Sequence, residues 1–125
     1  MKLISLILTG FVALEHVFIL VLEMFLWQTE YGMKAFQLTP ETASITATLA
    51  KNQGLYNGFL AAGLFWALLF IRDNRQKYQT IIFFLVCIIV AGIYGSITAK
   101  FSILFTQGLP AGLALLMHLV SNKEK

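Results

Sequence analysis

Charged residues are scarce in this sequence. Only 12% of its 125 residues are Asp, Glu, Lys or Arg, compared with about 25% in soluble domains, whereas 58% are hydrophobic and the mean hydropathy is +0.79. This composition excludes an ordinary soluble domain and indicates an integral membrane protein that contacts the lipid bilayer. The net charge of +3 requires no nucleic acid partner, because basic loops beside anionic lipid explain it.

Cysteine is almost absent. Cys87 lies alone within the apolar run IIFFLVCIIV, so the chain can form neither an intrachain disulfide nor a thiolate metal site. The sequence also lacks a nucleophile motif, a phosphate-binding loop and a convincing set of metal ligands. Glu15, His16 and Glu23 could bind a metal in principle, but Glu15 and His16 diverge by about 100° on a helix. We therefore expect no metal and no cofactor.

Four apolar runs are long enough to cross a membrane, which takes roughly 20 helical residues. They lie near 3–27, 53–71, 80–99 and 101–121. The last two are separated only by a polar cluster around Lys100, because a single helix through both would be about twice as long as a bilayer is thick. These runs predict an all-α polytopic membrane protein, a single four-helix bundle over residues 1–125.

One long connection, residues 28–52, joins the first two runs and is predicted to be extracytoplasmic, with a short helix. Within it, Thr39, Pro40 and Glu41 have the pattern of a helix start: a capping hydroxyl, a first-turn proline and an acidic residue. A helix from Pro40 to Ile71 would exceed the bilayer core. The second helix is therefore expected either to project outward or to break near Gly54.

Orientation follows from the basic residues of the short loops. If the N-terminus is cytoplasmic, six lie inside and three outside, which favours both termini in the cytoplasm. The inside set is Lys2, Arg72, Arg75, Lys77, Lys123 and Lys125, and the outside set is Lys34, Lys51 and Lys100.

Small residues recur at a spacing of four in two runs. Gly54 and Gly58 form GLYNG, and Gly108 and Gly112 form GLPAG. Such spacing places small side chains on one helix face, where another membrane helix can approach closely. The partner helix can belong to the same chain or to a homodimer, and the pattern leaves both open.

The first apolar run carries two acids and a histidine in LEHVFILVLEMFLW, residues 14–27. Thr9, His16, Glu23 and Trp27 fall on one stripe of a helix, and Glu15 lies near the bilayer midplane. A carboxylate at that depth costs at least about 2.5 kcal/mol, so it normally faces the protein interior and marks function.

Polar residues of the other runs gather in the predicted outer half, whereas inner stretches such as FLAAGLFWALLF have almost none. Pro110 adds a kink and leaves the Thr106 carbonyl without its helical donor. This asymmetry predicts a polar cavity open to the outer side above an apolar floor. The residues expected to bind a substrate there are Glu15, His16, Glu23, Trp27, Gln53, Tyr56, Asn57, Tyr94 and Gln107. His118 is expected to be an interfacial residue near the inner end.

The segments ALEHVFILVLEMFLW and NQGLYNGFLAAGL resemble a family of small bacterial membrane proteins catalogued as domain of unknown function 1304. The resemblance covers nearly the whole chain. It implies a multi-pass protein of the bacterial inner (cytoplasmic) membrane with four helices, but it implies no reaction. A looser similarity to small multidrug exporters rests on a four-helix chain of similar length and on Glu15 near the middle of the first helix. The second acid, the histidine and the long first loop depart from their pattern.

Three functions fit these patterns. The first is binding or transport of a small apolar or amphipathic molecule, linked to proton movement through Glu15 and Glu23. The second is an embedded enzyme that uses Glu15 or His16 as general acid or base on a lipid, quinone or sterol-like substrate. The third is a structural or accessory subunit whose polar residues only pack.

Overall fold

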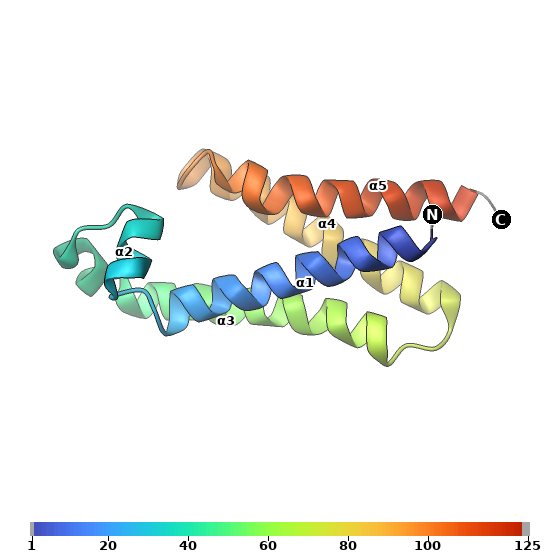
Figure 1. Cartoon of the computed structure of the whole chain (residues 1–125), viewed down its shortest axis with the longest axis horizontal. Coiled ribbons are helices and arrows are strands. Elements are labelled where there is room, and N and C mark those ends of the chain that lie inside the picture. Colours follow the sequence, from blue (N-terminus) through green and yellow to red (C-terminus); the bar gives the residue numbers. More distant parts are fainter. Residues whose placement is uncertain (1, 124–125) are drawn as a thin grey trace.

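The computed structural model describes residues 2–123, and its regular structure is all helical (Figure 1). The prediction of an all-α fold is therefore confirmed. The elements in chain order are α1 (Lys2–Met24), α2 (Glu30–Phe36), α3 (Pro40–Leu69), α4 (Asn74–Thr98), the π-helical segment η1 (Leu104–Gly108) and α5 (Leu109–Lys123).

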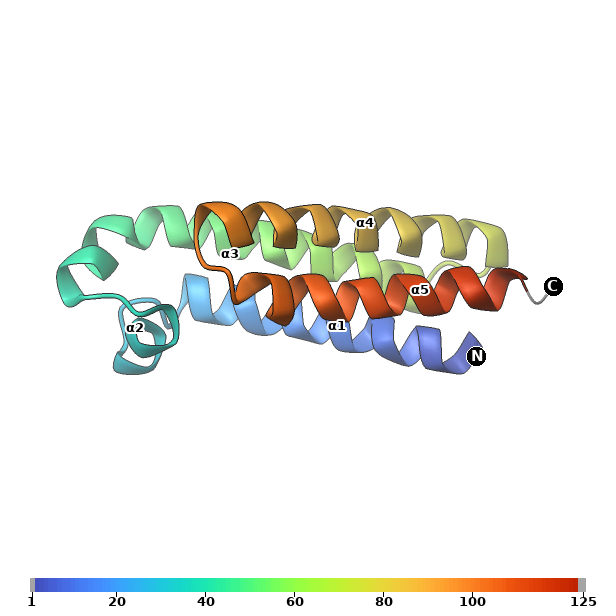
Figure 2. The same cartoon turned by 90° about the horizontal axis from the view of Figure 1, so that it is seen from above.

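Four long helices lie side by side and antiparallel to their neighbours (Figures 1 and 2). Helix α1 packs against α3 and α5, and α4 packs against the same two helices. The start of α1 and the end of α5 lie at the same end as the α3–α4 connection, which we call the terminal end. The opposite end, with α2 and the turn after α4, is called the loop end. These ends correspond to the predicted inner and outer sides.

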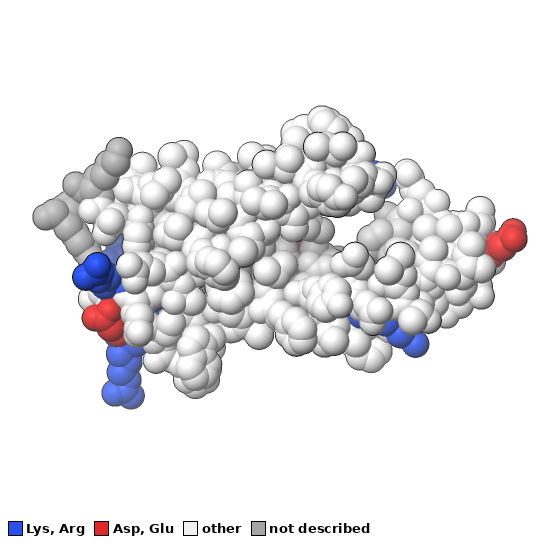
Figure 3. All heavy atoms as spheres, turned by 180° about the vertical axis from the view of Figure 1, so that it is seen from behind, with Lys and Arg blue, Asp and Glu red and all other residues white. Residues whose placement is uncertain are grey.

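Three helical segments are long and apolar enough to cross a membrane: Lys2–Met24, Asn74–Thr98 and Leu104–Asn122. Charged side chains lie mostly near the two ends of the face in Figure 3, and the surface between them is almost entirely uncharged. Large apolar side chains are exposed along the bundle, among them Leu3, Ile7, Phe11, Phe18, Phe83, Val90, Leu113 and Leu116. These features suggest a membrane protein.

Helix α3 is the fourth predicted span, and it does not reach the same hydropathy. Its first half contains the polar sequence KNQGLYN, and continuous apolar sequence begins only at Phe59. Three of the four predicted spans thus meet the requirement of length and composition.

The start of α3 is the predicted one. Thr39 caps it, since the Thr42 backbone N–H donates to Thr39 Oγ1 at 3.1 Å, and Pro40 is the first helical residue. The helix then continues without a break through Gly54 to Leu69, a length of about 45 Å. Of the two expected arrangements, the structure shows the continuous helix that projects past the end of α1 (Figure 1).

The last two predicted spans form a hairpin whose turn follows Thr98, as expected. The returning helix begins with the π-helical segment η1, where the Leu109 N–H donates to the Leu104 carbonyl. Pro110 follows directly and has no N–H for a regular helical bond. The irregularity predicted from Pro110 therefore takes the form of π-helical turns, which often occur near functional sites.

The apolar core lies in the terminal half of the bundle. All four long helices contribute to it: Val12, Ala13, Leu64, Ala67, Ile81, Leu85, Ile88, Ala111 and Ala114. This cluster agrees with the predicted apolar floor. At the loop end, α1 and α3 instead approach closely at Gly54. A Cβ at this position would lie only 3.2 Å from the Leu20 carbonyl oxygen, so the contact requires a glycine. The Gly54 face is thus used within the chain.

Candidate functional site

The polar stripe of α1 faces the bundle. Thr9 and His16 are almost fully buried, with exposed fractions of 0% and 1%, and Glu23 is half-buried. The prediction that this stripe points inward is confirmed for these residues. The consequence is a line of polar groups along the inner face of α1, which runs from the terminal half toward the loop end.

Glu23 is held by α3. Asn57 Nδ2 donates to Glu23 Oε2 at 2.9 Å and also lies 3.1 Å from the backbone carbonyl of Gln53. This bond joins Glu23 and Asn57, two residues that the sequence assigns to one site. It forms beside Gly54, whose missing side chain lets the two helices approach closely enough for this bond.

His16 has a defined tautomer. Its Nδ1 lies 2.8 Å from the Val12 carbonyl oxygen, and because a carbonyl can only accept, Nδ1 must carry the hydrogen. In the neutral ring Nε2 then has a free lone pair. A buried histidine prepared in this way can accept a proton or a hydrogen bond from a bound molecule.

Glu15 has an unsatisfied oxygen. Its Oε2 is buried and has no hydrogen-bond partner among residues 2–123, although the side chain as a whole is half-buried. A buried polar atom without a partner costs roughly 1–3 kcal/mol. The atom is therefore the strongest indication on α1 of a place where a proton, a water molecule or a ligand donor binds.

The remaining predicted residues are distributed more widely. Trp27 follows α1, and its Nε1 donates to Thr46 Oγ1 of α3 at 3.0 Å, while its ring packs on Phe36 with centroids 4.6 Å apart. It joins the loop-end segment to α3. Gln107 is half-buried on η1, and Gln53 is exposed on α3.

The two predicted tyrosines point to the surface. Tyr56 is 57% exposed and Tyr94 is 69% exposed, so neither is gathered with Glu23 and Asn57 as the bundle stands. Their role in binding stays a prediction. Tyrosines at such positions also suit a membrane–water interface.

A hollow opens on the face shown in Figure 3, between the turn after α4 and the segment that contains α2. Segment η1 packs on α4 and α5. The hairpin formed by α4 and the returning helix stands apart from α1 and α3 at the loop end. The hollow lies in the half of the bundle where the sequence predicts a cavity.

A second polar group lies at the terminal end and was missed by the sequence analysis. Thr9 Oγ1 donates to the Ser5 carbonyl at 2.8 Å and lies 2.8 Å from His118 Nε2. A hydroxyl has only one hydrogen, so with that donation His118 Nε2–H donates to Thr9. His118 is 6% exposed and lies near the C-terminal end of α5, where its bond to Thr9 holds its ring inside the bundle; an interfacial depth in the membrane stays a prediction. The sequence offered one signal for this group: Ser5 and Thr9 are four residues apart, so their hydroxyls lie on the same face of α1.

A cavity adjoins this group. About 50 Å³ there is open to water-sized atoms, between α1, α4 and α5. Among the residues that the structure describes, no three His, Cys, Asp or Glu side chains come together as a metal site.

Comparison with known proteins gives one family. The model of the family described as "Protein of unknown function (DUF1304)" matches residues 10–119. A relative from Lactococcus lactis subsp. lactis (strain IL1403), described as uncharacterized protein YpaA, is 36% identical over 118 residues, which cover 93% of this chain and 97% of the relative. No solved structure matches the chain.

Proposed function

The chain belongs to the DUF1304 family, and we propose that it is a four-span protein of the bacterial cytoplasmic membrane that binds a small, partly apolar molecule in the loop-end half of its bundle. Transport of that molecule, linked to proton movement on the α1 carboxylates, is the use we assign to the site. The observation that carries the proposal is the buried, unpartnered Oε2 of Glu15.

The chemistry of α1 supports a ligand with a hydrogen-bond donor or a positive charge. Glu15 offers an acceptor that the protein leaves unused, and Glu23 keeps one oxygen beyond its bond to Asn57 Nδ2. Apolar side chains surround these groups along the same helix. An amphipathic molecule with a cationic or amino group would satisfy the acceptors and fill apolar space at the same time.

Two observations support a crossing by α3. It packs along α1 over much of its length, so its two ends lie at opposite ends of a bundle whose other helices are long enough to cross. Its polar Asn57 is used inside the bundle by Glu23, which removes part of the cost of placing an amide in lipid. On this basis both termini and Arg72, Arg75 and Lys77 are cytoplasmic.

Ethidium is a suitable probe, because it combines a flat apolar ring system, a positive charge and amino donors. Purified protein in detergent should enhance ethidium fluorescence, and the variant Glu15→Gln should bind it at least about tenfold more weakly, a loss of about 1.4 kcal/mol. Glu41→Gln is the matched control, because Glu41 is an exposed acid at the start of α3. Equal binding by both variants would remove Glu15 from the site.

An enzyme is the second candidate, and the tautomer of His16 favours it. Its free Nε2 could act as a general base beside Glu15, in a proton-transfer reaction on a lipid, quinone or sterol-like molecule. Such chemistry requires a change in the ligand. Incubation of the protein with a membrane lipid extract in heavy water, followed by mass spectrometry, should then show deuterium incorporation that His16→Phe abolishes.

A further inference from the structure

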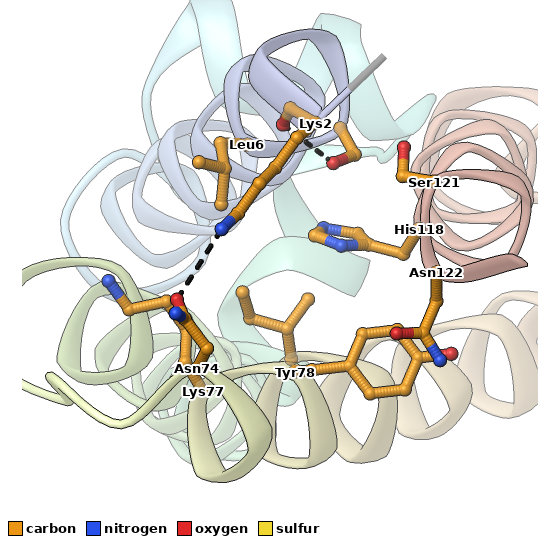
Figure 4. Close-up of a pocket in the computed structure, with 10 residues that line it drawn as sticks. Lys2, Leu6, Asn74, Lys77, Tyr78, His118, Ser121 and Asn122 are labelled. Atoms are coloured by element: carbon orange, nitrogen blue, oxygen red, sulfur yellow. Dashed lines mark hydrogen bonds between the residues drawn. The ribbon is translucent and has the colours of Figure 1, made fainter. Parts of the chain in front are cut away.

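The lining of the terminal-end cavity does not include Glu15, His16 or Glu23, the polar residues of the proposed binding site. Three helices contribute to it: Lys2, Ser5 and Leu6 from α1, Asn74, Lys77, Tyr78 and Ile81 from α4, and His118, Ser121 and Asn122 from α5. Figure 4 shows His118 reaching into the space between these helices, with Tyr78 opposite and Lys2 across its mouth. Most of these side chains can donate a hydrogen bond, and two are ammonium groups.

The positive charge of the lining has no acidic counterpart within it. Among the described residues, the lining contains no Asp or Glu. Lys2 Nζ donates to Asn74 Oδ1 at 3.4 Å, and Lys77 Nζ donates to the Leu68 carbonyl at 3.2 Å. Both ammonium groups are thus bonded to neutral oxygens, and an anion would offer them the opposite charge that these acceptors lack.

Among the described residues, one acid lies beside the cavity and caps a helix. Asp73 lines an adjoining surface recess that shares Asn74, Tyr78 and Asn122 with the cavity, and its Oδ1 accepts from the Gln76 backbone N–H at 2.8 Å as the cap of α4. That recess also contains Arg75. The surroundings of the cavity therefore remain basic.

Size limits the occupant. About 50 Å³ of the cavity is open to water-sized atoms, which is room for a compact group. A phosphate group has four oxygens around one phosphorus. The apolar side chains of Leu6 and Ile81 at the same cavity suit a group whose remaining part is less polar.

We propose that the terminal-end cavity binds a phosphate group, with Lys2 as a charge partner, Lys77 as a second one once it leaves the Leu68 carbonyl, and Tyr78 and Asn122 as further donors. The phosphate can come from an anionic lipid headgroup or from a soluble phosphate. Basic pockets between membrane helices bind lipid headgroups in this way, and two lysines at helix ends can reach a phosphate at the membrane surface.

The test uses the full chain in detergent, with phosphatidic acid and inorganic phosphate as separate probes and phosphatidylcholine as the neutral lipid. Binding is measured by native mass spectrometry for the lipids and by calorimetry for phosphate. The double variant Lys2→Gln/Lys77→Gln should bind the responsive probe about 30-fold more weakly, on the basis of about 1 kcal/mol per lysine. Lys34→Gln/Lys51→Gln is the control with the same change in net charge at the loop end.

A second variant separates the cavity from charge alone. Ser121→Leu leaves every lysine in place and fills part of the space, so it should also weaken binding at least about tenfold; thermal unfolding checks that it folds. Binding of phosphatidic acid but not phosphate identifies a lipid source, and the reverse identifies a soluble one. Equal loss in the two lysine pairs, normal binding by Ser121→Leu, or no preference for either phosphate probe over phosphatidylcholine would overturn the proposal.

Discussion

At the scale of single residues, the structure separates polar groups that are satisfied from those that are not. Asn57 and Glu23 bond to each other, and Thr9 and His118 do the same at the other end. Within residues 2–123, Glu15 Oε2 is the one buried side-chain oxygen that has no hydrogen-bond partner. A residue kept at a cost in stability is more plausibly retained for function than one that holds the fold together.

Replacement of Glu15 by Met should therefore stabilise the protein. Methionine has a similar length and removes the unsatisfied oxygen, so the free energy of unfolding should rise by about 1–3 kcal/mol. Asn57→Ala should lower it by about 0.6 kcal/mol, the average for a hydrogen bond between membrane helices. Thermal unfolding in one detergent measures both. A marked loss of stability in Glu15→Met would support the structural-subunit alternative.

Thr9→Val tests the hydrogen bond that the sequence did not reveal. The two side chains have the same shape, so the substitution removes one hydroxyl and leaves His118 Nε2 without its partner. We expect a loss of about 1 kcal/mol in the free energy of unfolding. Thr98→Val is the control, because Thr98 is exposed and bonds only to the Tyr94 carbonyl of its own helix. Equal effects would mean that the bond to His118 contributes nothing.

At the scale of elements, local sequence patterns predicted the helices well. The cap at Thr39, the hairpin turn after Thr98 and the disruption at Pro110 each depend on a few neighbouring residues, and each is present. The second apolar span was placed at 53–71, and the patterns left open whether the helix that starts at Pro40 continues into it, as α3 does. Hydropathy marked where the apolar sequence begins, but helix formation depends on caps and propensity, which the polar stretch 40–52 also provides.

The packing of α1 on α3 can be tested through glycine. Ala at Gly54 would bring a methyl group 3.0 Å from Glu23 Cβ and 3.2 Å from the Leu20 carbonyl oxygen, so the two helices must separate. We expect a loss of about 1–3 kcal/mol in unfolding free energy. Gly112→Ala has no atom within 4 Å of the new Cβ and should gain about 0.5–1 kcal/mol from helix propensity. If both variants gain stability, the close α1–α3 contact is wrong.

At the scale of the whole molecule, the sequence predicted which half carries the polar residues and grouped Asn57 with the carboxylates of the first helix, but it did not predict the other contacts. The period of a helix places Thr9, His16 and Glu23 on one face, and the structure buries that face. It could not give the rotation of α3 and α4, because that depends on packing between distant segments. Asn57 consequently turns toward α1, while Tyr56 and Tyr94 are exposed. The pairing of Thr9 with His118, 109 residues apart, has the same origin.

The arrangement in the membrane gives the last prediction. Four crossings with a cytoplasmic N-terminus place Lys34 and Lys100 outside and Arg75 inside, because translocation of the basic terminal end is disfavoured. In a Cys87→Ser background, which removes the one native thiol, single cysteines at these three exposed positions can be labelled on intact cells with a membrane-impermeant maleimide. Cysteines at 34 and 100 should react directly, and a cysteine at 75 should react only after permeabilisation.

If α3 does not cross, positions 34 and 75 lie on the same side and respond alike. If the orientation is reversed, position 75 alone reacts on intact cells, and the hollow at the loop end would then face the cytoplasm.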